Sequence, residues 1–296
     1  MNCPSAIHIM LITGMSGSGK SIALKALEDT GYYCVDNLPP SLLHLLINSI
    51  KLTDYKRVAV AIDARSGNDF SELPLIINQL KLASHKVDIL FLNASDDVLI
   101  RRFSETRRPH PLTINQQDKN LSQVIAHERA CLEIVQELSY SIDTSILQNN
   151  ALRILVQNIV NKISSNINNY NLNEENNLLL TIQSFGFKYG IPNDVDFMFD
   201  VRHLPNPYYD MALRPLTGLD KPVQEFLQQY ETVEQQIQDI VNYFNKWLPH
   251  FMQNRAYVTI GIGCTGGQHR SVYIVEKLAE LLRYKNTIIR HRQSKV

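Results

Sequence analysis

The sequence predicts an α/β protein with two domains: an N-terminal parallel sheet covered by helices on both faces, and a smaller C-terminal α/β domain. Short apolar segments alternate with segments of helical spacing over residues 7–163, a pattern typical of parallel sheets with two covered faces. A polar stretch at 164–177 then precedes a second, shorter series of strands and helices. Each region also contains a glycine-rich loop between an expected strand and an expected helix.

The N-terminal domain is expected to span residues 1–163 and to begin with the apolar strand 7–13, which glycine follows. The later strands are apolar or β-branched runs, and the helices have apolar residues three and four positions apart. The expected strands are 32–35, 57–62, 87–92 and 140–143, and the expected helices are 21–29, 41–50, 70–82, 97–103, 119–138 and 150–163.

Residues 164–177 hold seven asparagines in fourteen positions. Such a segment buries little apolar surface, so we expect it to link the two domains. The second domain then covers residues 178–296. Its expected strands are an apolar run within 177–187, then 196–201, 257–263 and 287–291, and its expected helices are 222–247 and 271–283. The proline-rich segment 202–221 is expected to be an ordered irregular loop.

Charge and apolar patterning exclude several classes of protein. The formal net charge is zero, which excludes a globally basic nucleic-acid coat but not a local basic patch. The longest apolar runs, such as Ile9–Ile12, are far shorter than the ~18 residues of a membrane span. No signal-peptide pattern follows Met1, and the four cysteines form no CxxC pair. We therefore expect a cytoplasmic protein with neither membrane insertion nor a disulfide framework.

The residues after the first strand fit the phosphate-binding P-loop pattern, G-x-x-x-x-G-K-[ST]. Glycines let the backbone wrap a phosphate, and the amides of the loop and of the following helix point positive dipoles at it. The lysine would reach the β- and γ-phosphates of a nucleotide, and the serine would bind Mg²⁺. The loop consists of Gly14, Met15, Ser16, Gly17, Ser18, Gly19, Lys20 and Ser21. The sheet that carries it is therefore expected to be P-loop kinase-like.

Two acidic residues follow expected strands, where ligands bind in open parallel sheets. Asp63 follows strand 57–62 and is the better candidate for the metal side of a nucleotide site, and Asp36 follows strand 32–35. Either could instead be a turn or helix-cap aspartate. An arginine cluster ahead of Pro109 fits the lid of small P-loop kinases, because arginine forks bind phosphates, or else a solvated basic surface. Its members are Arg101, Arg102, Arg107 and Arg108.

A second anion-binding loop is predicted between the expected strand 257–263 and the helix 271–283. It reads Cys264, Thr265, Gly266, Gly267, Gln268, His269, Arg270, Ser271, the spacing of cysteine-dependent phosphatases, in which amides and an arginine hold the phosphate that a thiolate attacks. Gly263 stands where those phosphatases carry a histidine, and no general acid can be assigned. We therefore predict first an anion site, with Thr265–Gly267 as its amide cradle and His269 and Arg270 as polar ligands. Phosphatase chemistry at Cys264 is the alternative.

The chain after Glu280 is basic and has no acidic residue. Lysine and arginine neutralise phosphates in the sequence-independent part of nucleic-acid binding. The predicted RNA-binding residues are Arg283, Lys285, Arg290, His291, Arg292 and Lys295. A solubilising tail is the other interpretation.

Together these motifs resemble the RapZ/YvcJ family of nucleotide-binding RNase adapter proteins, over nearly the whole chain. Besides the two loops, the resemblance rests on Asp36-Asn37-Leu38-Pro39, Asp63-Ala64-Arg65, the run SFGFKYG at 184–190, Asp200-Val201-Arg202 and Leu204-Pro205-Asn206-Pro207.

The resemblance implies that residues 14–21 bind ATP, that Asp63, Ala64, Arg65 and Ser66 bind GTP, and that both nucleotides are hydrolysed weakly. It implies that the C-terminal domain is similar to a phosphofructokinase subdomain and senses glucosamine-6-phosphate through Cys264, Thr265, Gly266, Gly267, His269 and Arg270. It also implies that the basic C-terminus binds a small regulatory RNA and presents it to an endoribonuclease, RNase E, which tunes amino-sugar synthesis. A two-component system would be a further partner, and the family assembles as homo-oligomers, as tetramers.

Two enzymatic alternatives remain from the residues themselves. One is a P-loop small-molecule kinase, which the P-loop, Asp63 and the arginine cluster favour. The other is a Cys264-dependent phosphatase. In the adapter hypothesis, a sugar phosphate at 265–270 and RNA on the adjacent C-terminal helix and tail would affect one another's binding.

Overall fold

The computed structural model describes residues 6–63, 72–106, 109–115, 120–165, 178–253, 255–284 and 286–293. The chain divides into two compact units, Met1–Ser164 and Ser165–Val296, and each is described by itself. Most of the predicted linker, residues 166–177, lies outside the described residues, and the preceding helix continues to Ser165.

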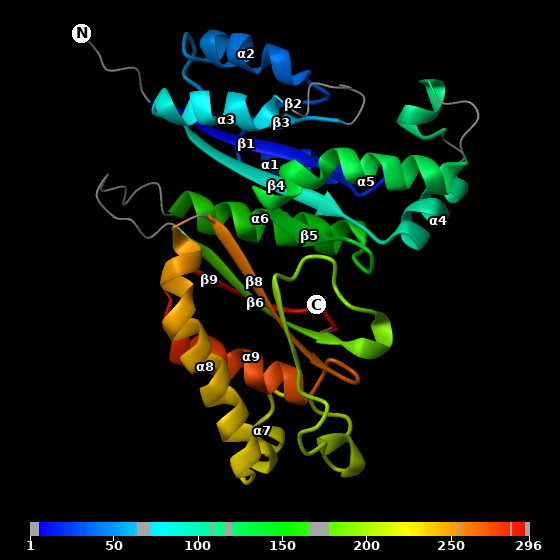
Figure 1. The fold of residues 1–296 in the computed structure, drawn as a ribbon, viewed down its shortest axis with the longest axis vertical. Helices are drawn as coiled ribbons and strands as arrows, with labels where there is room; N and C mark the ends of the chain where they lie inside the picture. The colour runs from blue at the N-terminus through cyan, green and yellow to red at the C-terminus, as the bar shows by residue number, and fades with distance from the viewer. Residues whose placement is uncertain are drawn as a thin grey trace. The chain divides into compact units, whose positions relative to one another are not determined.

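The first unit contains a five-stranded parallel sheet with the strand order β2-β3-β1-β4-β5. Its strands are β1 (His8–Gly14), β2 (Tyr33–Val35), β3 (Arg57–Ala61), β4 (Lys86–Asn93) and β5 (Tyr140–Asp143). Its helices are α1 (Lys20–Glu28), α2 (Leu43–Ile50), α3 (Leu73–Leu82), α4 (Asp96–Thr106), α5 (Leu121–Glu137) and α6 (Asn149–Ser165). In Figure 1, α3 lies on one side of this sheet and α6 on the other.

The core of this unit explains why its strands are mostly apolar. Alternate residues of β1, such as Ile9 and Leu11, join a buried cluster with apolar side chains of α2, α3 and α5. The intervening Met10 and Ile12 are also buried, as a sheet covered on both faces requires. The expected parallel sheet is therefore confirmed, with the P-loop after its central strand.

The second unit is a smaller α/β domain with a four-stranded parallel sheet in the order β7-β8-β6-β9. Its strands are β6 (Leu179–Gly186), β7 (Phe197–Asp200), β8 (Tyr257–Cys264) and β9 (Thr287–His291), and its helices are α7 (Lys221–Gln228), α8 (Glu231–Met252) and α9 (Arg270–Leu282). Apolar residues of β6 and β8 pack with α8 and α9 in one buried cluster.

The structure differs from the expected elements mainly at helix ends. Pro40–Leu42 form a 3₁₀ turn before α2, and α3 begins at Leu73, beside a proline in its first turn. The segment 222–247 is mostly helical as expected, and it is divided into two helices because the chain leaves helical geometry at Tyr230. Its second part continues past Pro249 to Met252. None of the described helices is long and apolar enough to cross a membrane.

Candidate nucleotide and anion sites

The P-loop lies between β1 and α1 and takes its shape from glycines. Gly14 has φ +130°, and a Cβ on it would lie 2.0 Å from the carbonyl oxygen of Leu92. Gly19 has φ +107° and stands at the N-cap of α1. The N–H groups of Lys20 and Ser21 open this helix and have no carbonyl acceptor within it. These N–H groups form the positive end of the helix dipole, which attracts a phosphate.

Lys20 and Asp63 meet at the P-loop. The Lys20 ammonium donates to the carbonyl oxygens of Gly14 and Met15, at 2.7 and 3.1 Å. Its Nζ lies 3.7 Å from Asp63 Oδ1, and both side chains are largely buried. Asp63 follows β3 as the sequence predicts, and its carboxylate lies beside the lysine that a phosphate would contact. Asp36, the other candidate, is exposed.

The remaining members of the predicted GTP segment, Ala64, Arg65 and Ser66, lie outside the described residues. So do Arg107 and Arg108 of the arginine cluster. Arg102 contacts the P-loop, since its Nη1 donates to Gly17 O at 3.0 Å and its Nη2 to Thr144 O at 2.7 Å. Arg101 is exposed and lies 3.9 Å from Glu105.

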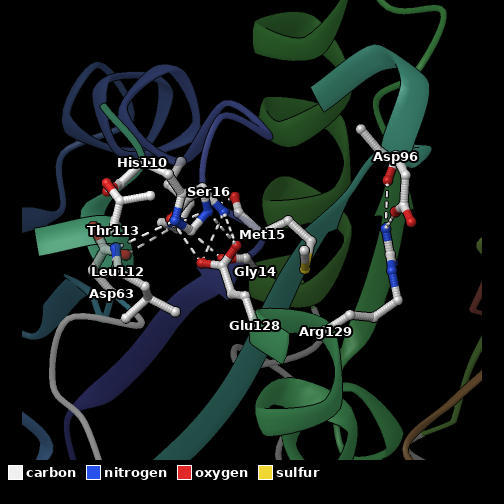
Figure 2. Close-up of polar contacts among 12 residues, drawn as sticks. Gly14, Met15, Ser16, Asp63, Asp96, His110, Leu112, Thr113, Glu128 and Arg129 are labelled. Atoms are coloured by element: carbon white, nitrogen blue, oxygen red, sulfur yellow. Dashed lines mark hydrogen bonds and ion pairs between the residues drawn. The ribbon is translucent and has the colours of Figure 1, made fainter. Parts of the chain in front are cut away.

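Sequence reasoning missed a buried carboxylate behind the P-loop. Glu128 on α5 is fully buried, and its two oxygens accept from Ser16 N at 3.1 and 3.0 Å. Figure 2 shows this carboxylate between Ser16 and His110. Ser16 and Glu128 are 112 positions apart, and no local pattern in the sequence joins them.

The second loop lies between β8 and α9, and it is also shaped by close backbone packing. Gly267 has φ +71°, and a Cβ there would lie 2.6 Å from Gly186 N and 2.3 Å from Gln293 Oε1. A Cβ on Gly186, at the end of β6, would lie 2.6 Å from the carbonyl carbon of Gly266. The loop amides therefore stand at the N-terminus of α9, which has thirteen residues.

Two side chains of this loop are held by hydrogen bonds, one within the loop and the other mainly to residues 202 and 204. Cys264 is buried, its Sγ accepts from Gly267 N at 3.1 Å, and Ser271 Oγ lies 3.1 Å away. The Arg270 guanidinium donates to the carbonyl oxygens of Arg202 and Leu204 at 2.7 and 2.8 Å, and Nη2 donates to Thr265 Oγ1 at 3.3 Å. The loop thus gathers a thiol and a guanidinium.

His269 contributes a neutral ring. Burial lowers its pKa below the ordinary value, so the ring carries no fixed charge near neutral pH. Of the two polar ligands predicted in this loop, Arg270 therefore carries the positive charge.

Lys188 adds a further charge that the sequence did not assign to the site. Its Nζ lies 3.9 Å from the position of a Cβ on Gly266, and its N–H donates to Thr265 O at 3.2 Å. The residue belongs to the run SFGFKYG, which carried part of the family resemblance and was the signal for it. The segment 202–221 also packs against the loop, because Gly218 N donates to Gln268 O at 2.8 Å.

Of the four predicted RNA-binding residues that the structure describes, three lie against acidic side chains. Arg283 is exposed, but Arg290 Nη1 donates to Asp194 at 2.8 Å, and Arg292 Nη1 lies 3.5 Å from the same carboxylate. His291 lies 2.9 Å from Glu276 Oε1 and 2.9 Å from Ser184 Oγ. Asp194 is nearly inaccessible. Lys285 and Lys295 lie outside the described residues.

Several solved kinases align with part of the chain. A shikimate kinase from Bacteroides thetaiotaomicron is 13% identical, covers 54% of this chain and 99% of its own, and gives a TM-score of 0.36. A gluconokinase from Sinorhizobium meliloti is 16% identical, covers 57% of this chain and 98% of its own, and gives a TM-score of 0.34.

Two family models and several relatives cover nearly the whole chain. The model of the RapZ-like N-terminal domain matches residues 7–166, and that of the RapZ C-terminal domain matches residues 178–295. A nucleotide-binding protein of Burkholderia cenocepacia is 50% identical over 98% of this chain and 95% of its own. One of Paraburkholderia xenovorans is 50% identical over 98% and 97%. With both halves matched in order, the chain belongs to the RapZ family.

Proposed function

We propose that this protein is a regulatory nucleotide-binding protein that holds ATP at residues 14–21 and a sugar phosphate, glucosamine-6-phosphate, at residues 264–270. We propose further that it acts as an RNase adapter, which binds a small regulatory RNA and directs it to RNase E. One observation carries the proposal: each unit has a strand–loop–helix cradle in which glycines allow a backbone approach that a Cβ would block.

The nucleotide half of the proposal uses Lys20, Ser21 and Asp63. Lys20 would exchange its contacts with Gly14 O and Met15 O for phosphate oxygens. The Ser21 hydroxyl and the Asp63 carboxylate are hard oxygen ligands, which suit Mg²⁺. That ion, bound with ATP, would neutralise phosphate charge. GTP at Asp63–Ser66 and weak hydrolysis of both nucleotides are proposed from family membership.

The sugar-phosphate half uses Arg270, Thr265, Lys188 and the amides at the start of α9. The Arg270 guanidinium donates two hydrogen bonds to backbone carbonyls, so it is held as a fixed charge beside the cradle. Lys188 supplies a second positive charge on a more exposed side chain. A phosphate monoester with a polar sugar body matches this combination of guanidinium, ammonium and amides.

The RNA half rests on family membership and on the basic C-terminal segment. Arg283 is exposed, whereas Arg290 and Arg292 would have to leave Asp194 before their side chains could contact RNA phosphates. We propose that sugar-phosphate binding biases this exchange, because the tail residue Gln293 packs directly against Gly267 of the loop. RNase E, a two-component system and a homotetramer are the partners and assembly proposed with it.

The test is RNA binding by the purified full chain in a gel shift at fixed salt, with and without glucosamine-6-phosphate. The proposal predicts binding that the metabolite changes, and a smaller metabolite effect in K188A. RNA binding that saturating metabolite leaves unchanged would contradict the linkage. If the protein binds MgATP but no RNA, the adapter role is contradicted, whereas the proposed nucleotide site still stands.

A Cys264-dependent phosphatase is a second candidate, because Gly267 N and Ser271 Oγ both lie 3.1 Å from Sγ, as a nucleophilic thiolate would need. Hydrolysis of a phosphate monoester that C264S abolishes would establish it. Hydrolysis that survives in C264S would exclude this thiol.

A further inference from the structure

A buried polar cluster supports the P-loop from behind. Glu128 is 0% exposed, and its carboxylate accepts from the Ser16 amide through both oxygens, at 3.1 and 3.0 Å. Ser16 Oγ also donates to Oε1, at 2.7 Å. The amide and the hydroxyl of one P-loop residue are thus bound to a single carboxylate on α5 (Figure 2).

His110 is the third member of this cluster, and its contacts show which ring nitrogen donates to Glu128. Its Nδ1 accepts from Leu112 N at 3.2 Å, so the ring proton sits on Nε2. That nitrogen lies 3.2 Å from Glu128 Oε2 and donates to it. The residue's own carbonyl accepts from Thr113 Oγ1 at 2.6 Å. His110 therefore joins the short segment 109–113 to Glu128, and through Glu128 to the P-loop.

The same cluster reaches α4. The rings of Phe103 and His110 lie 4.9 Å apart, and Phe103 Cε2 lies 3.3 Å from the position of a Cβ on Gly17. Four parts of the first unit thus meet around residues 16 and 17: the P-loop, α4, segment 109–113 and α5.

The contacts of this cluster hold the Glu128 carboxylate in a fixed position. Both ring nitrogens of His110 are engaged, and the Glu128 carboxylate accepts from Ser16 N, Ser16 Oγ and His110 Nε2. A buried carboxylate is stable only while its donors are in place, so the cluster resists any movement of Ser16. The amides of Lys20 and Ser21, by contrast, stay available at the start of α1.

We propose that Glu128 and His110 are positioning residues for nucleotide binding, which hold the first half of the P-loop at Ser16 in the shape that accepts the phosphate chain. This inference rests on the proposed nucleotide site. His110 would act on the phosphate cradle only through Glu128.

The substitution E128Q changes the carboxylate to an amide of the same shape, whereas E128A removes the side-chain group altogether. An amide nitrogen in place of Oε1 would face Ser16 Oγ, which can turn and accept from it. The remaining oxygen, in place of Oε2, would still accept from Ser16 N and His110 Nε2. The amide nitrogen would also face the Ser16 N–H, which in the wild type donates to Oε1 at 3.1 Å. E128Q therefore loses that contact and keeps those made through Oε2, whereas E128A removes them all. Glu133, exposed on the same helix, gives the matched control E133Q.

The experiment measures the Kd for MgATP of the full chain by calorimetry, at a temperature where circular dichroism shows each variant folded. E128A and H110A should each bind about tenfold more weakly than the wild type, since each loses a hydrogen bond to a charged group. E128Q should bind within about threefold, and E133Q like the wild type. The double variant E128A/H110A should bind no more weakly than E128A, because both changes act through one contact; two independent losses of stability would add.

Folded E128A or H110A with a Kd within twofold of the wild type would overturn the inference, as would additive losses in the double variant. If E128A does not fold, H110A alone and H110A in the E128Q background decide it, since tenfold weaker binding is predicted for both. If the wild type does not bind MgATP, or K20A binds it equally well, the proposed nucleotide site is what fails.

Discussion

Removing the carboxylate of Asp194 should lower the free energy of unfolding of the second unit far more than a substitution at an exposed residue does. Asp194 accepts from Gln183 Nε2 and Arg290 Nη1, both at 2.8 Å, and lies 3.5 Å from Arg292 Nη1. The side chains of Asp194, Arg290 and Arg292 are only 2%, 10% and 4% exposed. D194A would leave two guanidinium groups buried without this carboxylate.

The expected cost is about 3–5 kcal/mol, the usual result of removing one partner from a buried ion pair. With a urea dependence of about 2 kcal/mol per molar, the midpoint of unfolding should fall by roughly 1.5–2.5 M. This is a large share of the about 5–15 kcal/mol that stabilises a typical domain.

The assay can follow the second unit alone. The chain has one tryptophan, Trp247, and it lies on α8 of this unit, so its fluorescence reports the unfolding of this unit. Asp239, exposed on the same helix, provides the control D239A, with an expected change within about 0.5 kcal/mol. A D194A midpoint within 0.5 M of the wild type would refute the view that Arg290 and Arg292 are held by a buried ion pair.

Three further predictions follow from single contacts. G14A should destabilise the first unit by at least about 3 kcal/mol in urea unfolding followed by circular dichroism, because its Cβ would lie 2.0 Å from Leu92 O. G190A, whose Cβ would have no atom within 4 Å, should cost about 1–2 kcal/mol for its positive φ alone. Equal costs for the two variants would contradict the packing argument. Burial lowers the pKa of His269, so the stability that the neutral ring contributes is present above the ordinary value of about 6.5 and is lost as the pH falls below it. In urea unfolding followed by Trp247 fluorescence, H269Q should therefore lose less stability than the wild type between pH 7.5 and 5.5. An identical loss in the two proteins would contradict this prediction. Among the described cysteines, the exposed Cys131 should react first with a thiol reagent at pH 8, as peptide mapping would show. Cys264 is buried, and burial raises the pKa of the Cys34 thiol to about 11. Reaction of Cys264 before Cys131 would contradict the prediction and indicate that the Cys264 thiol is accessible.

The sequence was sufficient wherever the signal is local. The β1–P-loop–α1 unit, the β8–loop–α9 unit and every strand could be placed, because apolar runs and glycine spacing depend only on neighbouring residues. The basic tail could not be interpreted from charge alone, because Asp194, which binds Arg290 and Arg292, lies 96 and 98 positions away. Glu128 was missed for the same reason, since its partner Ser16 is distant along the chain. Lys188 belongs to the run SFGFKYG, on which the family resemblance partly rests, but only the fold brings its ammonium close to Gly266.

The central claim is that this chain has two separate phosphate sites, one in each unit. The most direct measurement is calorimetric titration of the wild type, K20A and K188A with MgATP and, separately, with glucosamine-6-phosphate. We predict that K20A loses MgATP binding and keeps the sugar phosphate, and that K188A does the reverse. Loss of both ligands in either folded variant, or of neither ligand in both, would contradict the account.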